Sequence, residues 1–107
     1  MDELEFRKRA DEALQNLQRS LERASDRYEF EADAKEGALT IEFEDPPARF
    51  VVSPNSPVRQ IWVSARVKSF KLDWSEDRKE FILPDNRSLS QLIAGVIGEQ
   101  LGEEVSL

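Results

Sequence analysis

The 107-residue sequence contains neither cysteine nor histidine. Without cysteine, the chain can form no disulfide bond and no thiolate metal site. It also has no cysteine nucleophile and no imidazole base, which excludes the commonest designs of nucleophilic catalysis. Asp and Glu remain as side chains that could run acid–base chemistry or bind a metal.

The sequence also lacks a long hydrophobic run. No stretch of about 18 apolar residues is present, so no segment is predicted to span a membrane. The first residues, MDELEFRKRADE, are too charged for a signal peptide, and we expect a cytoplasmic protein. Because the net charge is −7, nucleic acid and anionic membranes are disfavoured as partners, whereas a basic protein or a metal cation fits the sign.

The composition is that of one folded domain. Hydrophobic residues make up 39% of the chain and charged residues 35%, which is typical of a polar but foldable sequence. A chain of this length can bury one modest core. Because no repeat, low-complexity segment or domain boundary is visible, we predict a single domain over residues 1–107.

An amphipathic helix is predicted at each end of the chain. Asp2 and Glu5 have the spacing of an N-terminal capping box, and apolar residues then recur at helical spacing over about residues 3–24. Ser88 and Gln91 repeat this spacing before a second apolar stripe over residues 89–101. Gly102 is expected to cap the second helix at its C-terminal end.

Two glycines fall inside the second helix. Gly95 and Gly98 each cost roughly 1 kcal/mol of helix stability relative to alanine. Their presence suggests that the helix packs closely against a neighbouring element at both positions.

Short segments between the helices alternate between apolar and polar residues, as strands with one solvated face do. They are separated by turn signals such as Gly37 and the proline-containing stretches DPPA and SPNSP. The segments are YEFEADA (28–34), ALTIEFE (38–44), RFVV (49–52), RQIWVSA (59–65), SFKLDW (69–74) and KEFIL (79–83).

Strands joined by short turns form an antiparallel sheet, and two helices with one apolar stripe each must cover one face of it. The predicted fold class is therefore α+β. It is a two-layer α–β sandwich with two helices on one face of an antiparallel sheet of about six strands. One core should contain Phe6, Leu14, Leu17, Leu21, Phe30, Leu39, Ile41, Phe43, Ile61, Val63, Phe70, Leu72, Leu92, Val96 and Ile97.

The segment RQIWVSA raises a question about Trp62. If Ile61 and Val63 face the core, Trp62 lies on the bare face of the sheet. One interpretation is an interface anchor, because tryptophan buries a large rigid surface and offers one N–H donor. The alternative is a side chain that only packs against its neighbours across the strands.

Several short motifs resemble the frataxin family. They are the acidic first strand, GALTIEF, Asn55, the block from Pro57 to Ser64 that contains QIWVSA, FKLDW, and the tail LGEEVSL. The block from Pro57 to Ser64 is the most specific, and the resemblance covers nearly the whole chain. The length, with no transit peptide, is similar to that of the bacterial branch.

The resemblance implies a two-layer sandwich that acts in iron–sulfur cluster assembly, binds the cysteine desulfurase and the scaffold protein, and binds iron weakly on an acidic ridge. It places Trp62 in the partner-binding surface, with Asn55, Gln60 and Ser64 beside it. Within SPNSP, Asn55 also has the alternative interpretation of an ordinary turn residue.

The metal-binding residues that the resemblance implies are carboxylates on the outer face of the first helix and the first strand: Asp11, Glu22, Asp26, Glu29, Glu31 and Asp33. Carboxylates on one strand face are roughly 6.5–7 Å apart, so they would hold iron loosely, and other divalent cations should compete. The alternative is a solvated strand face that prevents edge-to-edge aggregation.

This chain departs from the acidic run that bacterial members carry at the end of the first helix. Its sequence QRSLERASDR contains Arg19, Arg23 and Arg27. We expect these arginines to pair with the acids, compete with the metal, and make iron binding weaker or differently placed.

The predicted function is an iron-binding regulator of iron–sulfur cluster assembly that docks through the acidic ridge and Trp62. The alternative is an iron chaperone or store with weak ferroxidase activity on surface carboxylates. We favour the regulator and predict no catalytic residues, because outward-pointing carboxylates form no pocket in which a pKa is displaced. A monomer is expected, with iron as a possible cause of oligomers.

Overall fold

The computed structural model describes all 107 residues. None of its helices combines the length and hydrophobicity needed to cross a lipid bilayer. In chain order the elements are α1 (Glu3–Ala24), β1 (Glu31–Lys35), β2 (Ala38–Glu44), β3 (Pro47–Asn55), the 3₁₀ turn η1 (Ser56–Val58), β4 (Gln60–Ala65), β5 (Lys68–Ser75), β6 (Glu80–Ile82) and α2 (Leu89–Leu101).

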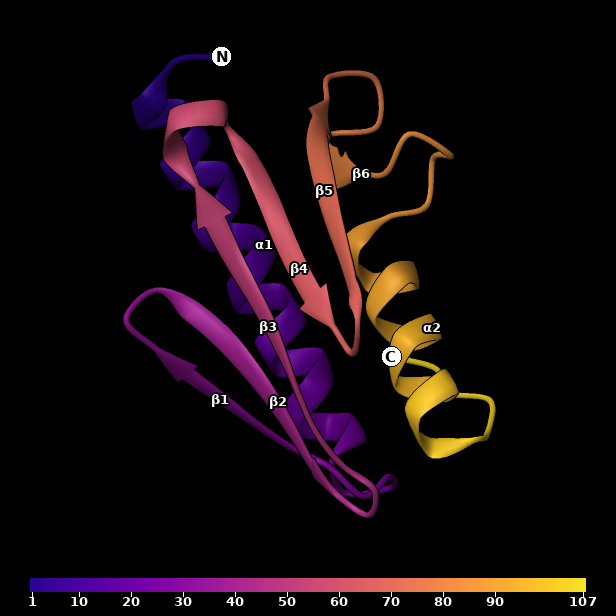
Figure 1. Ribbon diagram of the computed structural model, residues 1–107. Helices are drawn as coiled ribbons and strands as arrows, with labels where there is room; N and C mark the ends of the chain where they lie inside the picture. The colour runs from indigo at the N-terminus through magenta and orange to yellow at the C-terminus, as the bar shows by residue number, and fades with distance from the viewer.

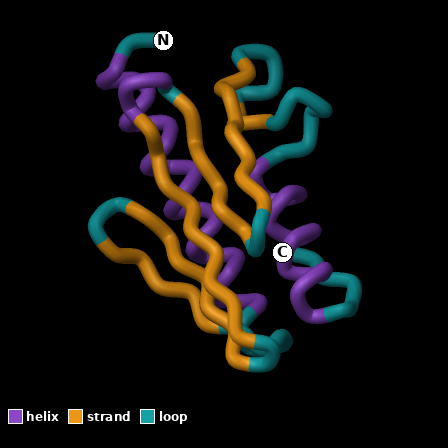
Figure 2. Tube along the Cα trace, viewed as in Figure 1, coloured by secondary structure: helices purple, strands orange, loops and turns teal.

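The six strands form one antiparallel sheet in which each strand pairs with the next along the chain. In Figure 1, α1 crosses behind the middle strands and α2 lies at the right, next to β5, and Figure 2 shows the helices and strands in the same view. Hydrophobic residues of both helices and of one sheet face form a single buried cluster. The predicted α+β sandwich, with its second sheet face free of helices, is confirmed.

Local signals explain where the helices begin and end. The Asp2 side chain accepts a hydrogen bond from the Glu5 backbone N–H at 2.8 Å. Ser88 and Gln91 exchange both hydrogen bonds of a capping box. Gly102 follows α2 with a φ of 71°, the left-handed conformation that glycine adopts at low cost.

The predicted start of the first strand is three residues too early. After α1, the backbone N–H groups of Arg27 and Tyr28 donate to the Ala24 carbonyl, so the chain first makes a tight turn. β1 begins only at Glu31, where Glu42 of β2 becomes available as its partner. Alternation between apolar and polar residues could not reveal this turn.

The SPNSP break is also shorter than predicted. Its first three residues belong to β3, and only Ser56–Val58 forms a turn. The last pairing between β2 and β3 joins Leu39 to Val52, so Pro54 has a neighbouring strand on the β4 side alone. A proline lacks an N–H donor and is tolerated at such one-sided positions.

Every residue of the predicted core is buried except Phe70, which is only partly buried, and the core also contains residues outside the prediction, such as Phe50 and Ile93. Ile61 is 0% exposed and Trp62 is 37% exposed, which confirms the predicted register of β4. Phe81 was missing from the predicted core. Its ring lies edge-on to Phe6, at 5.8 Å between centroids, and to Trp74, at 5.2 Å.

The two glycines of α2 differ in their surroundings. A Cβ atom on Gly98 would lie 2.8 Å from the carbonyl oxygen of Glu103, so the chain after the helix does pack closely there. A Cβ atom on Gly95 would meet no heavy atom within 4 Å. The expectation of close packing is therefore confirmed at Gly98 and wrong at Gly95, which faces solvent.

Candidate functional site

The sheet face that no helix covers brings the four predicted partner-binding residues together. Gln60, Trp62 and Ser64 alternate outward along β4. Asn55, the last residue of β3, is paired with Gln60 and therefore shares its face. We call this surface, around Asn55, Gln60, Trp62 and Ser64, the outer face.

Trp62 has defined neighbours on the outer face. Its indole N–H donates to the Oε1 atom of Gln60 at 2.9 Å, and the Nζ atom of Lys71 lies 4.8 Å from the ring centroid. The Nε2 group of Gln60 in turn donates to Oδ1 of Asp73 at 3.0 Å. Trp62 thus packs against its neighbours across the strands and also keeps a substantial part of its surface open.

Lys71 and Asp73 are functional candidates that the sequence did not single out. The alternation of SFKLDW places both opposite to the core residue Leu72. Which β4 residue each one meets depends on the pairing of the strands, which joins Trp62 to Lys71 and Gln60 to Asp73. That register can be read only from the folded sheet.

Small side chains separate Trp62 from the first strand. Across the sheet, Thr40 pairs with Val51 and Val51 pairs with Ser64, while Ser53 pairs with Trp62. None of these residues except Trp62 has a large or charged side chain. The long side chain beside Trp62 is that of Lys71, on the β5 side.

An acidic hollow of about 570 Å³ lies where the α1–β1 loop meets the β2–β3 turn. Arg27 is the only cationic residue in its lining. Three of its carboxylates were predicted from the sequence, and the three from β2 and the β2–β3 turn were missed because they lie far away in the chain. The carboxylate residues are Asp26, Glu29, Glu31, Glu42, Glu44 and Asp45.

The other three predicted metal ligands lie outside the acidic hollow. Asp11 lines a separate hollow beside the β1–β2 turn. Glu22 accepts a hydrogen bond from Gln18 on the exposed side of α1, and Asp33 is paired with Thr40 on the sheet. The six predicted carboxylates therefore do not all line one hollow.

The acidic hollow has suitable donors for a hard cation but no closed ligand set. Carboxylate oxygens are the groups that such cations prefer. However, no group of three or more Asp and Glu side chains in the structure is arranged so that it could hold a metal ion. The hollow supplies concentrated negative charge, which attracts cations and basic groups without fixing their coordination.

The expectation that Arg19, Arg23 and Arg27 pair with these acids is wrong. Arg19 donates to Asn16 and Arg23 to Ser20, the residues that lie three positions earlier on the same helix. Arg27 donates to the backbone carbonyl of Ser106 and stacks over Tyr28. Helical spacing and the C-terminal tail thus give these guanidinium groups neutral partners, and the carboxylates of the acidic hollow form no ion pair.

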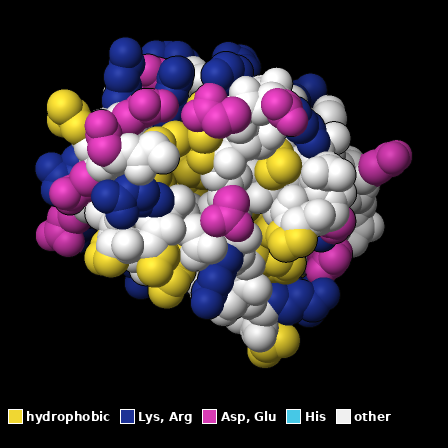
Figure 3. Space-filling view, turned by 90° about the horizontal axis from the view of Figure 1, so that it is seen from above, with side chains coloured by type: hydrophobic (Ala, Val, Ile, Leu, Met, Phe, Trp, Pro, Cys, Tyr) yellow, Lys and Arg dark blue, Asp and Glu magenta, His cyan; other side chains and the backbone are white.

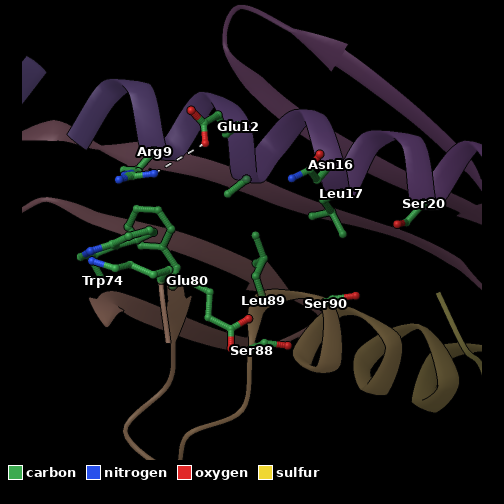
Figure 4. A pocket seen from close by; sticks show the side chains of 13 residues that line it. Arg9, Glu12, Asn16, Leu17, Ser20, Trp74, Glu80, Ser88, Leu89 and Ser90 are labelled. Atoms are coloured by element: carbon green, nitrogen blue, oxygen red, sulfur yellow. Dashed lines mark ion pairs between the residues drawn. The ribbon is translucent and has the colours of Figure 1, made fainter. Parts of the chain in front are cut away.

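A smaller cavity of about 240 Å³ lies between α1 and the beginning of α2. Figure 4 shows Arg9 reaching from α1 toward Trp74, whose ring centroid is 5.1 Å from the guanidinium carbon. Leu17 and Leu89 line the same cavity. The sequence gave no indication of it, because its walls come from elements distant in the chain.

The end of the molecule that carries the N-terminus, η1 and the β5–β6 turn is not acidic in character. Figure 3 shows Lys and Arg interspersed with Asp and Glu on this end, with hydrophobic side chains between them.

Hydrogen bonds from Lys79, and then from Trp74, lower the pKa of Glu76 in the β5–β6 turn. The backbone N–H of Arg87 chiefly lowers the pKa of Asp85. Both are turn-stabilising contacts away from the outer face and the acidic hollow.

Comparisons with known proteins agree with this architecture. The family model for the frataxin-like domain matches residues 1–103. The iron-sulfur cluster assembly protein CyaY of Azotobacter vinelandii is 31% identical over 88% of this chain and 87% of its own. The CyaY protein of Dechloromonas aromatica is 32% identical over 100% of this chain and 99% of its own.

A solved structure extends the comparison to the fold. The frataxin from Psychromonas ingrahamii superposes with a TM-score of 0.84 over 99% of this chain and 97% of its own, at 20% identity. This likeness shows the fold alone, because so few residues are shared. Together with a family model that matches almost the whole sequence, and a relative above 30% identity across its full length, the comparisons show that this chain belongs to the frataxin family.

Proposed function

We propose that this protein regulates iron–sulfur cluster assembly by binding the cysteine desulfurase–scaffold complex through its outer face. Two relatives, both named as iron-sulfur cluster assembly proteins, support a role in this process. The observation that carries the proposed surface is Trp62, 37% exposed on a sheet face that no helix covers. Tryptophan is among the residues enriched at interface hot spots.

The acidic hollow adds a second, electrostatic contribution. Its six carboxylates should attract a basic surface of the partner and speed association. They should also concentrate iron weakly, in competition with other divalent cations, because the donors are hard oxygens without a fixed geometry. Both effects should fade with added salt, since the Debye length is about 8 Å at physiological ionic strength.

Binding of Trp62→Ala to the desulfurase–scaffold complex tests the proposal. Loss of a hot spot costs about 2 kcal/mol or more, which corresponds to roughly 30-fold weaker binding, mainly through faster dissociation. Leu4→Ala is the matched control, because Leu4 is also hydrophobic and is 79% exposed on α1, away from the outer face. Equal affinities of the two variants would contradict the proposed surface.

The alternative of an iron chaperone or store with ferroxidase activity makes a different prediction. An oxidase would consume ferrous iron in air with saturable turnover, and substitutions in the acidic hollow would abolish it. We propose instead that iron acts as a weakly bound ligand of a regulator. The parent protein should then oxidise ferrous iron no faster than the Glu29→Gln/Glu31→Gln variant, which lacks two carboxylates of the acidic hollow.

A further inference from the structure

We propose that Asp73 is a positioning residue that fixes the orientation of Trp62 before the partner binds. This inference rests on the proposed function of the outer face. Asp73 does not touch the indole and acts through Gln60, which lies between them. Lys71 completes the arrangement by holding the ring from one side.

The direction of the Gln60 amide follows from hydrogen-bond chemistry. An ionised carboxylate accepts hydrogen bonds and donates none, and an amide has a donor end and an acceptor end. Asp73 can therefore hold only the Nε2 end of Gln60, to which it lies at 3.0 Å. This leaves Oε1 facing the indole N–H of Trp62 at 2.9 Å.

The opposite amide orientation is disfavoured at both ends. It would place the Gln60 oxygen against the Asp73 carboxylate and the Gln60 NH₂ group against the indole N–H. Two acceptors and two donors would then face each other, and each would lose a hydrogen bond. Asp73 thereby selects the one amide orientation that can accept from Trp62.

Lys71 restricts the ring in a second direction. It is paired directly across from Trp62, and its Nζ atom lies 4.8 Å from the ring centroid. A cation at this distance is attracted to the face of an indole and covers it. The indole thus has its N–H satisfied and one face occupied before any partner arrives.

This arrangement determines what the partner can offer. The partner meets an oriented ring whose N–H already has an acceptor, so it should contact the open part of the ring and not the N–H. A side chain held in its bound orientation loses less conformational entropy on binding. Asp73 should therefore strengthen binding without contributing a contact of its own.

Three single variants test the role of Asp73. Asp73→Ala removes the acceptor for Gln60, whereas Asp73→Asn removes the charge and keeps a carbonyl oxygen that can accept. Asp77→Ala is the matched control, because Asp77 is an exposed acid of the β5–β6 turn that makes no hydrogen bond or ion pair. The readouts are the two indole ¹⁵N–¹H NMR signals and the affinity for the desulfurase–scaffold complex.

Asp73→Ala should shift and broaden the indole signal of Trp62 and weaken binding about threefold to tenfold, the effect of one hydrogen bond. The Trp74 signal should not move, because its N–H donates to Glu76 at 3.0 Å. Asp73→Asn should bind with an affinity between those of the parent and Asp73→Ala, because its carbonyl can accept from Gln60 but its NH₂ group can also donate. Asp77→Ala should match the parent.

Two results would overturn the proposal: an unchanged Trp62 signal in Asp73→Ala, or Asp73→Asn binding as weakly as Asp73→Ala although its Trp62 signal matches that of the parent. The first would show that Asp73 does not position the indole, and the second would show that its charge acts on the partner directly. Trp62→Ala in the same assay separates the two levels of inference. Full binding by that variant would refute the proposed function, whereas its loss together with full binding by Asp73→Ala would refute the positioning role alone.

Discussion

Ile61 and Trp62 are consecutive residues of β4 that point to opposite faces, so truncating each to alanine should produce opposite effects. Ile61 is fully buried beneath the helices and pairs with Leu72 across the β4–β5 ladder. Ile61→Ala removes buried methyl and methylene groups and leaves a cavity, which typically costs about 2–5 kcal/mol. In a domain of this size, the melting temperature should fall by about 8 °C or more.

Trp62→Ala should cost less stability, although the side chain is much larger. The substitution loses one hydrogen bond to Gln60 and one cation–π contact with Lys71, each worth about 0.5–1 kcal/mol at an exposed site. It leaves no sealed cavity, because the site already opens to water. The expected loss is therefore about 1–2 kcal/mol, whereas binding to the desulfurase–scaffold complex should weaken about 30-fold.

Chemical denaturation and binding assays on the same samples distinguish the two residues. Affinities should be calculated per folded molecule, and Ile61→Val, with an expected cost of about 0.5–1.5 kcal/mol, provides a milder variant if Ile61→Ala does not fold. Ile61→Ala should then bind normally. If Trp62→Ala melts far lower than Ile61→Ala and binds normally, Trp62 is a packing residue and the assignment of the outer face is wrong.

Three further predictions follow from other parts of the structure. Gly95→Ala should stabilise the protein by about 0.5–1 kcal/mol, because alanine favours a helix and a Cβ atom has open space there. Gly98→Ala should destabilise it by displacing the tail at Glu103, and equal denaturation midpoints for the two variants would contradict this. In an NMR titration, ferrous iron should perturb signals lining the acidic hollow, with Mn²⁺ competing at similar concentrations, and perturbations confined to β5 and β6 would refute that site. In the folded state the pKa values of Glu76 and Asp85 lie below their usual 4.5 and 3.8. The stabilisation that each carboxylate gives the folded state is therefore present above its usual pKa and is lost as the pH falls through its lowered pKa. The melting temperature should drop as the pH falls below 4.5, and less steeply in Glu76→Gln.

Local patterns in the sequence were sufficient for the architecture. The capping residues Asp2 and Ser88 lie next to the helices that they begin. The spacing of apolar residues, with a period of 3.6 in helices and 2 in strands, indicates which side chains face the core. Because a strand alternates strictly, a buried Ile61 requires an outward Trp62. These signals act within a few residues, so neither the fold nor the place of Trp62 on the outer face needed tertiary information.

Only the tertiary structure decided which residues meet across elements. The pairing of β4 with β5 places Asp73 beside Gln60 and Lys71 beside Trp62. The turn between β2 and β3 brings Glu44 to the same hollow as Asp26, and the tail gives Arg27 a backbone partner in place of an acid. Such contacts depend on strand register and turn geometry, which are set when the whole core packs, so the residues involved carry no local sign of them.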